Sequence, residues 1–375
     1  MVLQIMKDNG VVQWKKTEVN VDDHVFVPQF PPHLTSYDEY VEEYVSDMHL
    51  RKLSPSRPLW EFHFLNYKTT NGEAIMIVNV HHMLGDGASL VALARACSTR
   101  PSHNPTLSQT LISSTSHHTE LPAQVHKIRS LDTTWFGFDG IYRLWNLVFT
   151  VVLVMWYTLL DLITTFSRFK WVEDSRFPIR GHPGVEMLPK VIASNNFKLQ
   201  DIREIKNRVG GTVNDVVMGV VFYGFRLYCQ MDLPDPKQTE NLKVTAIALI
   251  NTRSRHGTKN EGEMPKSKTR TPQGNSFGFL HLKVPMKKLE NPLEYVQRAK
   301  HMSDKKKMSL AAFVIAKLIS YITRFKGPEG TAKAMYNTLA NTTLSVTNVN
   351  GPTEKSSLIG YKVKRSFFSV SGIPQ

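Results

Sequence analysis

Apolar and polar positions along the chain follow two periods, one typical of strands and one typical of helices. Short apolar runs rich in β-branched and aromatic residues predict strands at residues 59–65 and 73–80, joined through a polar turn at 69–72. Further strands are expected at residues 4–6 and 242–250 and near Leu344 and Phe367, and helices at 37–48, 88–96, 199–209, 292–303 and 309–324. The pattern predicts a mixed α/β chain.

The first predicted helix and the strand after it carry residues with structural explanations. Ser36 and Glu39 have the spacing of a capping box, in which each side chain bonds the other residue's backbone N–H. The apolar stripe of residues 37–48 is typical of core packing. Trp60 is expected to anchor packing beside a site, and His63, which alternates with apolar neighbours, to be structural rather than catalytic.

A second helix start is predicted in the middle of the chain. The stripe of residues 199–209 ends at Gly210, a residue suited to a helix C-cap. Thr212 and Asp215 have capping-box spacing, which places Asn214 and Asp215 in the first turn of the next helix. An aspartate at a helix start is often only a cap, so its structural role and a role in a site both stay open.

The most informative segment is residues 81–87, HHMLGDG, between the strand 73–80 and the helix 88–96. Two glycines permit a tight strand-to-helix turn there. Strand side chains alternate between faces, so His81 and His82 are expected to point in opposite directions. One of them can serve chemistry, because an imidazole with a pKa near 6.5 accepts and returns a proton at neutral pH.

The net charge indicates which kinds of molecule the protein binds, and the cysteine content indicates its compartment. The net charge of +14 and the isoelectric point near 9.6 favour anionic partners such as phosphates, acidic lipid head groups or nucleic acid. Nucleic acid is the least expected, because no basic recognition helix or aromatic RNA-binding pattern stands out. Cys97 and Cys229 lie far apart without metal-ligand spacing, which favours a reducing compartment and argues against a disulfide framework.

An apolar run at residues 144–166 contains a single charged residue, Asp161, and is bracketed by Arg143 and Arg168. A helix of that length can cross roughly 30 Å of hydrocarbon. Membrane association is therefore expected, with a buried core helix as the alternative. The N-terminus lacks the apolar core of a signal peptide.

Two polar stretches, residues 102–122 and 254–271, are predicted to be loops. The first carries His103, His117 and His118, but no cysteine or carboxylate ligand accompanies them, so no metal site is expected.

The segment 81–87 resembles the HHxxxDG signature of the CoA-dependent acyltransferase superfamily. Companion motifs follow the same order: PLW at residues 58–60, ND at 214–215, a glycine-bounded segment at 274–278 and an NVxGP element at 348–352. Together they resemble a plant-type wax ester synthase/diacylglycerol acyltransferase over nearly the full chain.

This resemblance implies a two-lobed CoA-dependent acyltransferase-like fold with mixed sheets and a central channel, plus one membrane-associated helix. It makes His82 the general base for transfer of a fatty acyl group from acyl-CoA to a fatty alcohol or diacylglycerol. Asp86 is expected to be structural, pairing with an arginine for which Arg253 is the candidate, and Asn214 to orient a substrate or stabilise an oxyanion. His81, Gly87 and Asp215 are supporting or structural at the site. Acyl-CoA is a co-substrate, and no permanently bound cofactor is expected.

The expected domains are an N-terminal lobe with its linker (1–122), a membrane-associated segment (123–176) and a C-terminal lobe (177–375) that lacks its final strand and helix. A chain truncated at both ends raises an alternative, a catalytically inactive membrane-bound family member. A soluble-type acyltransferase acting on small alcohols is another.

Localisation follows from the order of the motifs, because His82 precedes the apolar run and Asn214 follows it. Both must share one compartment to form one site. The run is therefore expected to lie in the membrane interface, or to enter and return, unless another segment also crosses. We expect the endoplasmic reticulum membrane, or the plasma membrane, with both lobes cytosolic and in contact with membrane lipids.

Overall fold

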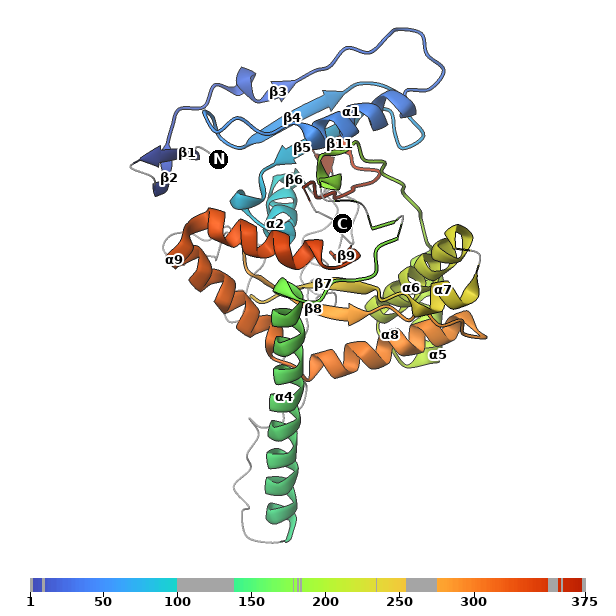
Figure 1. Cartoon of the computed structure of the whole chain (residues 1–375). Helices are drawn as coiled ribbons and strands as arrows, with labels where there is room; N and C mark the ends of the chain where they lie inside the picture. The colour runs from blue at the N-terminus through green and yellow to red at the C-terminus, as the bar shows by residue number, and fades with distance from the viewer. Residues whose placement is uncertain are drawn as a thin grey trace, which may run out of the picture.

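The computed structural model describes residues 3–372 except 9–10, 100–137, 178, 181, 183, 234, 254–274, 350–356 and 359. Two α/β lobes lie one above the other, and a single long helix projects from the lower lobe (Figure 1). The two-lobed fold with mixed sheets and one apolar helix agrees with the sequence-based expectation.

The N-terminal lobe is built on a three-stranded sheet in the order β3-β4-β5, parallel between β3 and β4 and antiparallel between β4 and β5. The predicted hairpin is present, with Leu65 opposite Ile75 and Trp60 opposite Val80. A separate hairpin, β1–β2, precedes this sheet. The elements are β1 (Leu3–Asp8), β2 (Val11–Lys16), η1 (Val21–Asp23), β3 (Val25–Phe26), α1 (Asp38–Leu50), β4 (Trp60–Leu65), β5 (Ile75–Val80), η2 (His82–Leu84) and α2 (Gly87–Cys97).

The C-terminal lobe has a sheet in the order β8-β7-β9, with β8 antiparallel and β9 parallel to β7. The elements up to β8 are α4 (Phe138–Lys170), η3 (Val185–Met187), α5 (Leu199–Val209), α6 (Val213–Asp232), α7 (Pro236–Asn241), β7 (Thr245–Asn251) and β8 (Phe277–Lys283). They are followed by α8 (Pro292–Lys307), α9 (Ala311–Ala340) and β9 (Leu344–Val346). A small sheet joins the ends of the lobes: β6 (Ser98–Thr99) pairs with β10 (Ser357–Leu358), which pairs with β11 (Tyr361–Lys362).

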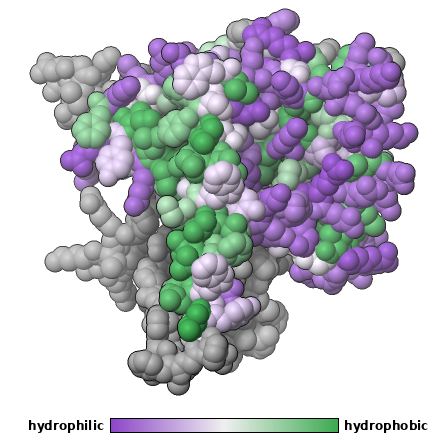
Figure 2. Space-filling model, turned by 60° about the horizontal axis from the view of Figure 1, so that its bottom comes forward, coloured by the Kyte–Doolittle hydropathy of each residue, from purple (hydrophilic) through white to green (hydrophobic). Residues whose placement is uncertain are grey.

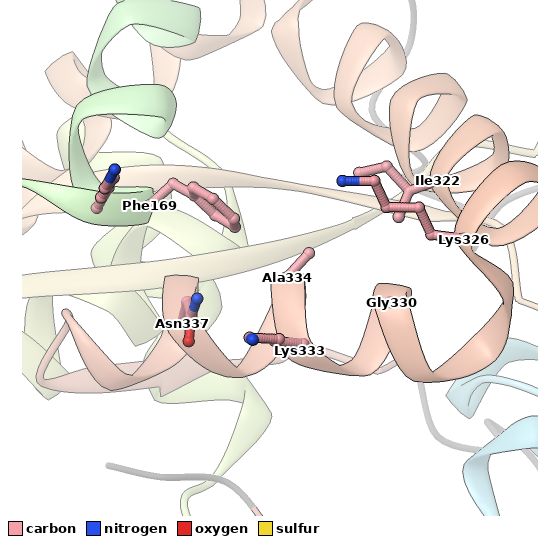
Figure 3. Close-up of a pocket in the computed structure, with 8 residues that line it drawn as sticks. Phe169, Ile322, Lys326, Gly330, Lys333, Ala334 and Asn337 are labelled. Atoms are coloured by element: carbon pink, nitrogen blue, oxygen red, sulfur yellow. The ribbon is translucent and has the colours of Figure 1, made fainter.

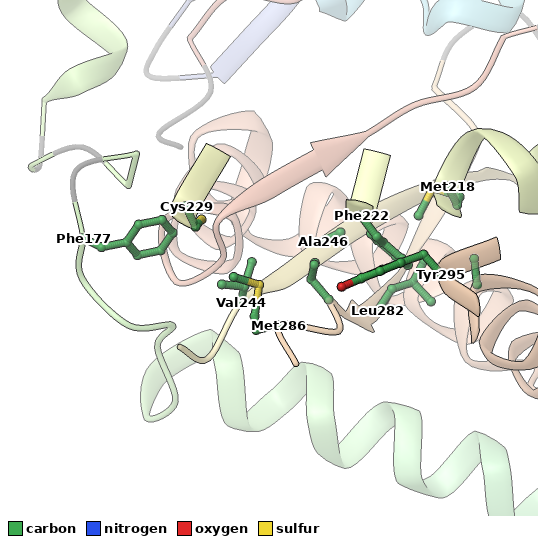
Figure 4. Packing of buried hydrophobic residues seen from close by; sticks show 11 residues of the cluster. Phe177, Met218, Phe222, Cys229, Val244, Ala246, Leu282, Met286 and Tyr295 are labelled. Atoms are coloured by element: carbon green, nitrogen blue, oxygen red, sulfur yellow. The ribbon is translucent and has the colours of Figure 1, made fainter. Parts of the chain in front are cut away.

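Helices cover both faces of the β8-β7-β9 sheet. On one face α6 and α8 pack over Ala246 and Leu282, with Phe222 and Tyr295 fully buried between them (Figure 4). On the other face α9 packs over Ile247 and Phe279. Successive strand residues therefore serve two cores, which is the arrangement of a three-layer α/β/α lobe.

The long helix α4 has two different halves. Its C-terminal half is held to the lobe by polar contacts: buried Asp161 forms an ion pair with Lys306 of α8, and the Thr158 hydroxyl accepts a 2.9 Å hydrogen bond from the N–H of Leu310. Its N-terminal half projects away from the lobe (Figure 1). Large apolar side chains are exposed on that half: Ile141, Tyr142, Leu144, Trp145, Val148, Phe149, Val152, Met155 and Trp156.

Some predicted local features are wrong. The Ser36–Glu39 capping box does not form, because α1 begins at Asp38 after Tyr37, and the Ser36 hydroxyl donates to the Asp38 carboxylate. The strand expected near Phe367 is missing: within residues 363–372 no strand pairing is present, since the chain leaves the sheet after β11. In contrast, Gly210 does form the left-handed C-cap of α5.

Candidate active site

The HHMLGDG turn begins where β5 ends at Val80. The N–H of His81 donates to the carbonyl of Leu59 at 3.1 Å, so the PLW motif directly supports the turn. His81 then caps the short helix η2, because its Nδ1 accepts the N–H of Met83 at 3.2 Å. We expected His81 and His82 to point in opposite directions because strand side chains alternate. That reason is wrong, because both histidines follow the last residue of β5.

His82 is exposed at the junction of the lobes. Its backbone carbonyl accepts a 3.0 Å hydrogen bond from the side-chain amide of Asn275, and its ring lies 5.9 Å from the ring of Phe277 in an edge-on arrangement. Both partners belong to the C-terminal lobe. Within the described residues no hydrogen bond joins the His82 ring to another side chain, so its nitrogens can serve an incoming hydroxyl.

His81 is exposed like His82, but its ring accepts a hydrogen bond within the turn. Burial and the neighbouring His82 both lower the pKa of His81, which favours its neutral form. A neutral ring is also required for Nδ1 to accept the Met83 N–H. The geometry therefore gives His81 a structural position in the turn.

Asp86 is buried and lies between the lobes. Its Oδ1 accepts the N–H of Ser89 at 3.1 Å in the first turn of α2. Its Oδ2 accepts the N–H of Ser276 at 3.0 Å and lies 2.8 Å from Nη1 of Arg253. Arg253 also donates to the Ser89 hydroxyl at 3.0 Å. The expected pairing of Asp86 with Arg253 is confirmed, and it joins the N-terminal turn to the ends of β7 and β8.

The charge of Asp86 is stabilised by these donors. Burial raises the pKa of its carboxyl group, but hydrogen bonds from Arg253 and from the backbone N–H groups of Ser276 and Ser89 outweigh that effect. The net pKa lies below its ordinary value, so Asp86 is ionised at neutral pH.

The ND and NVxGP motifs meet beside the same turn. Asn348 donates a 3.2 Å hydrogen bond to the side-chain carbonyl of Asn214. The next residue, Val349, lies 3.6 Å from the position where a Cβ on Gly87 would be. Gly87 thus allows the start of α2 to approach this segment, and the motifs far apart in sequence gather at one place.

Asp215 does not join this group. Its carboxylate accepts both the N–H and the hydroxyl of Thr212 at 2.8 Å, which completes the predicted capping box of α6. The side chain is buried, and its contacts are those of a cap. The capping role predicted for Asp215 is therefore confirmed, and a supporting role at the site stays a prediction.

Sequence reasoning named the segment 274–278 but gave its residues no role. Asn275, Ser276 and Phe277 contact His82 or Asp86. Gly278 has a packing reason, because a Cβ there would lie 2.0 Å from the carbonyl oxygen of Ala312. The motif was visible in the sequence, but its contacts needed the fold.

In the described part of the chain no group of three or more His, Cys, Asp or Glu side chains is arranged to hold a metal ion. His103, His117 and His118 lie outside the described residues, as do the predicted loops at 102–122 and 254–271.

Comparison with known proteins gives consistent results. Residues 2–146 match the family model "Wax ester synthase/diacylglycerol acyltransferase catalytic domain", and residues 273–375 match "WS/DGAT C-terminal domain". The chain is 31% identical to wax ester synthase/diacylglycerol acyltransferase 11 of Arabidopsis thaliana, an alignment that covers 98% of this chain and 75% of that protein. It is 29% identical to wax ester synthase/diacylglycerol acyltransferase 2 of the same plant, over 98% and 74%.

A solved structure shares the fold. The wax ester synthase/diacylglycerol acyltransferase from Marinobacter aquaeolei VT8 aligns with a TM-score of 0.54 at 16% identity. The alignment covers 96% of this chain and 71% of the bacterial chain.

Proposed function

This chain belongs to the wax ester synthase/diacylglycerol acyltransferase family, and we propose that it transfers a fatty acyl group from acyl-CoA to a long-chain alcohol or diacylglycerol. The observation that carries the proposal is the position of His82, exposed where both lobes meet and beside the converging family motifs. A site between two lobes can admit two substrates from different sides, as a transfer between acyl-CoA and an acceptor requires.

In the proposed reaction His82 acts as a general base. It takes the proton of the acceptor hydroxyl while that oxygen attacks the thioester carbonyl carbon. The tetrahedral intermediate then expels the CoA thiolate, the C–S bond breaks, and the proton held by His82 passes to sulfur. The products are an ester and free CoA, and no covalent enzyme intermediate is needed.

Two neighbouring residues support this step without exchanging the proton. Asp86 is a positioning residue, because its bonds to Arg253 and Ser276 hold the turn that carries His82 against the C-terminal lobe. Asn214 is proposed to stabilise the developing oxyanion through its side-chain N–H group, since its carbonyl oxygen already accepts from Asn348. A donor fixed in this way needs no reorganisation as negative charge develops.

The activity is tested with the purified full chain in detergent, labelled acyl-CoA and either hexadecanol or diacylglycerol. We expect an acceptor-dependent labelled ester that is missing with His82→Ala. Free fatty acid alone would refute ester synthesis. No product at all would favour the inactive alternative, whereas esters formed only with short alcohols would favour the small-alcohol acyltransferase. An acceptor series also ranks wax ester against triacylglycerol synthesis.

We also propose that α4 lies along one face of a membrane. Gly140–Lys170 is by itself long and apolar enough to cross a bilayer. However, Asp86 precedes α4 and contacts Arg253 and Ser276, which follow it, so a single full span would separate residues that touch. Asp161 gives no indication of how deeply α4 enters the membrane, because it forms an ion pair with Lys306 within the protein.

The exposed surface supports the same orientation. Apolar side chains of α4 gather in one band beside a strongly polar region (Figure 2). The band continues along the docked half at Leu160, Ile163 and Phe166, opposite the face that carries Asp161. Such a side-on stripe suits burial in one leaflet. We place both lobes on the cytosolic face of the endoplasmic reticulum.

Topology in sealed microsomes tests this orientation. Epitope tags inserted in the stretches 102–122 and 254–271 should both be cleaved by protease added from the cytosolic side. Protection of only one tag would establish a single span and refute the proposal. Carbonate extraction of the same membranes distinguishes an embedded chain from one held by charge alone.

A further inference from the structure

A cavity of about 440 Å³ lies beside the docked end of α4, outside the active site. It forms because α9 bends at Gly327, whose φ of 70° is non-helical, and Pro328, which cannot continue the hydrogen-bond ladder. The two arms of α9 diverge, and Phe169 and Lys170 at the end of α4 close the third side (Figure 3). Its volume falls within the range of small-molecule sites, roughly 300–1,000 Å³.

The lining combines apolar walls with positive charge. Figure 3 shows Phe169 pointing between the arms toward Ala334, with Lys326 on the opposite wall. The complete lining is Phe169, Lys170, Ile322, Lys326, Gly330, Lys333, Ala334 and Asn337. It therefore holds three lysines and an amide but no carboxylate. Glu329 belongs to the same helix but does not line the cavity.

This composition selects an anion that carries an apolar part. Lys170, Lys326 and Lys333 are exposed, and among the described residues no ion pair joins any of them to a carboxylate. Three ammonium groups around one cavity favour an anion, and lysine binds phosphate as a point charge. The walls formed by Phe169, Ile322 and Ala334 suit an alkyl or glyceryl segment better than a free inorganic ion.

The surroundings indicate where such a molecule comes from. Three large aromatic residues that directly neighbour lining residues in the sequence are exposed: Trp171 at 75%, Tyr321 at 59% and Phe325 at 80%. Val314, Leu318, Tyr321 and Phe325 form one exposed stripe along the first arm of α9, at helical spacing. Aromatic and lysine side chains together are typical of the lipid head-group region. We propose that this cavity binds the phosphate head group of an anionic membrane phospholipid.

The proposal is independent of acyl transfer, because no lining residue contacts His82 or Asp86 through the contacts described above. Binding is therefore measured directly, by calorimetric titration of the full chain in neutral detergent with dioctanoyl phosphatidate. The test variant is the double substitution Lys326→Gln/Lys333→Gln. The matched control is Lys287→Gln/Lys288→Gln, which removes the same charge from exposed lysines after β8.

We expect the cavity variant to bind at least about 10-fold more weakly, and the control to bind like the wild-type chain. A second variant, Ala334→Leu, fills the cavity without changing charge and should weaken binding as well. His82→Ala should bind normally, which separates this site from the reaction.

Three results would overturn the proposal. Equal weakening in both lysine pairs would mean general attraction to a basic protein. Inorganic phosphate that binds as tightly as the lipid would exclude a head-group site. Octanoyl-CoA that binds through Lys326 and Lys333 when phosphatidate does not would make the cavity an acyl-CoA site instead.

Discussion

His82 and Asp86 lie four residues apart in one turn, yet their surroundings are opposite. His82 is exposed: Asn275 donates a hydrogen bond to its backbone carbonyl, whereas its ring contacts Phe277 edge-on and has no hydrogen bond among the described residues. Asp86 is buried. One of its carboxylate oxygens accepts a hydrogen bond from the N-terminal lobe, and the other is bound by groups of the C-terminal lobe. The comparison separates two tasks: one residue is available to a substrate, while the other fixes where that residue stands.

Under the proposed mechanism, this difference explains why the turn carries both residue types. A base must exchange its proton with a substrate, so permanent partners on its ring would compete with the reaction. A residue that joins two lobes must do the reverse and keep its partners, because an unpaired buried charge is costly. The pKa of Asp86, below its ordinary value, agrees with a permanently ionised structural group.

The largest expected effect comes from the two adjacent histidines. His82→Ala should lower the acyl-transfer rate by about 10²- to 10⁴-fold, the usual contribution of a general base. His81→Ala should lower it far less, since among the described residues the one hydrogen bond of the His81 ring is the 3.2 Å bond that caps η2. Initial rates with labelled acyl-CoA check both. A greater loss in His81→Ala than in His82→Ala would reverse the assignment.

Asp86→Asn should mainly lower the free energy of unfolding. The amide keeps the shape but loses the charge opposite Arg253, so we expect a loss of roughly 2–4 kcal/mol in unfolding free energy. Activity should fall with it. Urea unfolding followed by tryptophan fluorescence measures the loss, and an unchanged midpoint with reduced activity would show that Asp86 is not structural.

The pairing of Asp86 with Arg253 should also make the stability of the fold depend on pH. Because the pKa of Asp86 is lowered in the fold, its stabilisation is complete above the unfolded value of about 3.9 and is lost as pH falls through the folded pKa. The stability gap between wild type and Asp86→Asn should therefore be constant from pH 7 to 5 and narrow below about pH 4. A gap that closes near pH 6 would implicate a histidine instead.

Substitutions at Asn214 and Asn348 distinguish the proposed oxyanion donor from the residue that orients it. Asn214→Ala should lower kcat by roughly 10- to 100-fold if its amide meets the oxyanion, which is at the low end for such donors. Asn348→Ala removes only the 3.2 Å bond that orients Asn214 and should cost a few-fold. Steady-state kinetics separates the two, and equal effects would leave Asn214 a structural residue.

Asn275→Ala is expected to have the smallest effect. Its side chain holds the carbonyl of His82 from the opposite lobe at 3.0 Å, so its loss loosens the turn without removing a reacting group. We expect about a 3- to 10-fold lower kcat with KM little changed. A change confined to KM would place Asn275 in substrate binding.

The sequence predicted features that depend on local spacing. The Thr212–Asp215 capping box, the Gly210 C-cap and the hairpin between β4 and β5 all formed as expected. The pairing of Asp86 with an arginine, for which Arg253 was the candidate, was expected from the resemblance to the family, and the pair spans the two lobes. Such signals involve a few residues with one physical explanation each.

Features decided by tertiary packing were not predicted. Spacing suggested a cap at Ser36, but the serine hydroxyl donates to Asp38, whose carboxylate also accepts hydrogen bonds from Thr70 in the turn before β5. The helix expected to end at Arg324 continues to Ala340 past a bend at Gly327, and that bend opens the lysine-lined cavity. Apolar composition identified α4, whereas its docking through Asp161 and Thr158 depends on partners on α8 and in the loop after it.

The division between His82 and Asp86 is tested most directly by a double-mutant cycle that measures acyl-transfer rate and unfolding free energy on the same preparations. We predict that His82→Ala unfolds like the wild type. His82→Ala/Asp86→Asn should match His82→Ala in residual rate, because misplacing an absent base costs nothing, and match Asp86→Asn in stability. A double variant that is much slower than His82→Ala, or a His82→Ala chain as unstable as Asp86→Asn, would contradict the account.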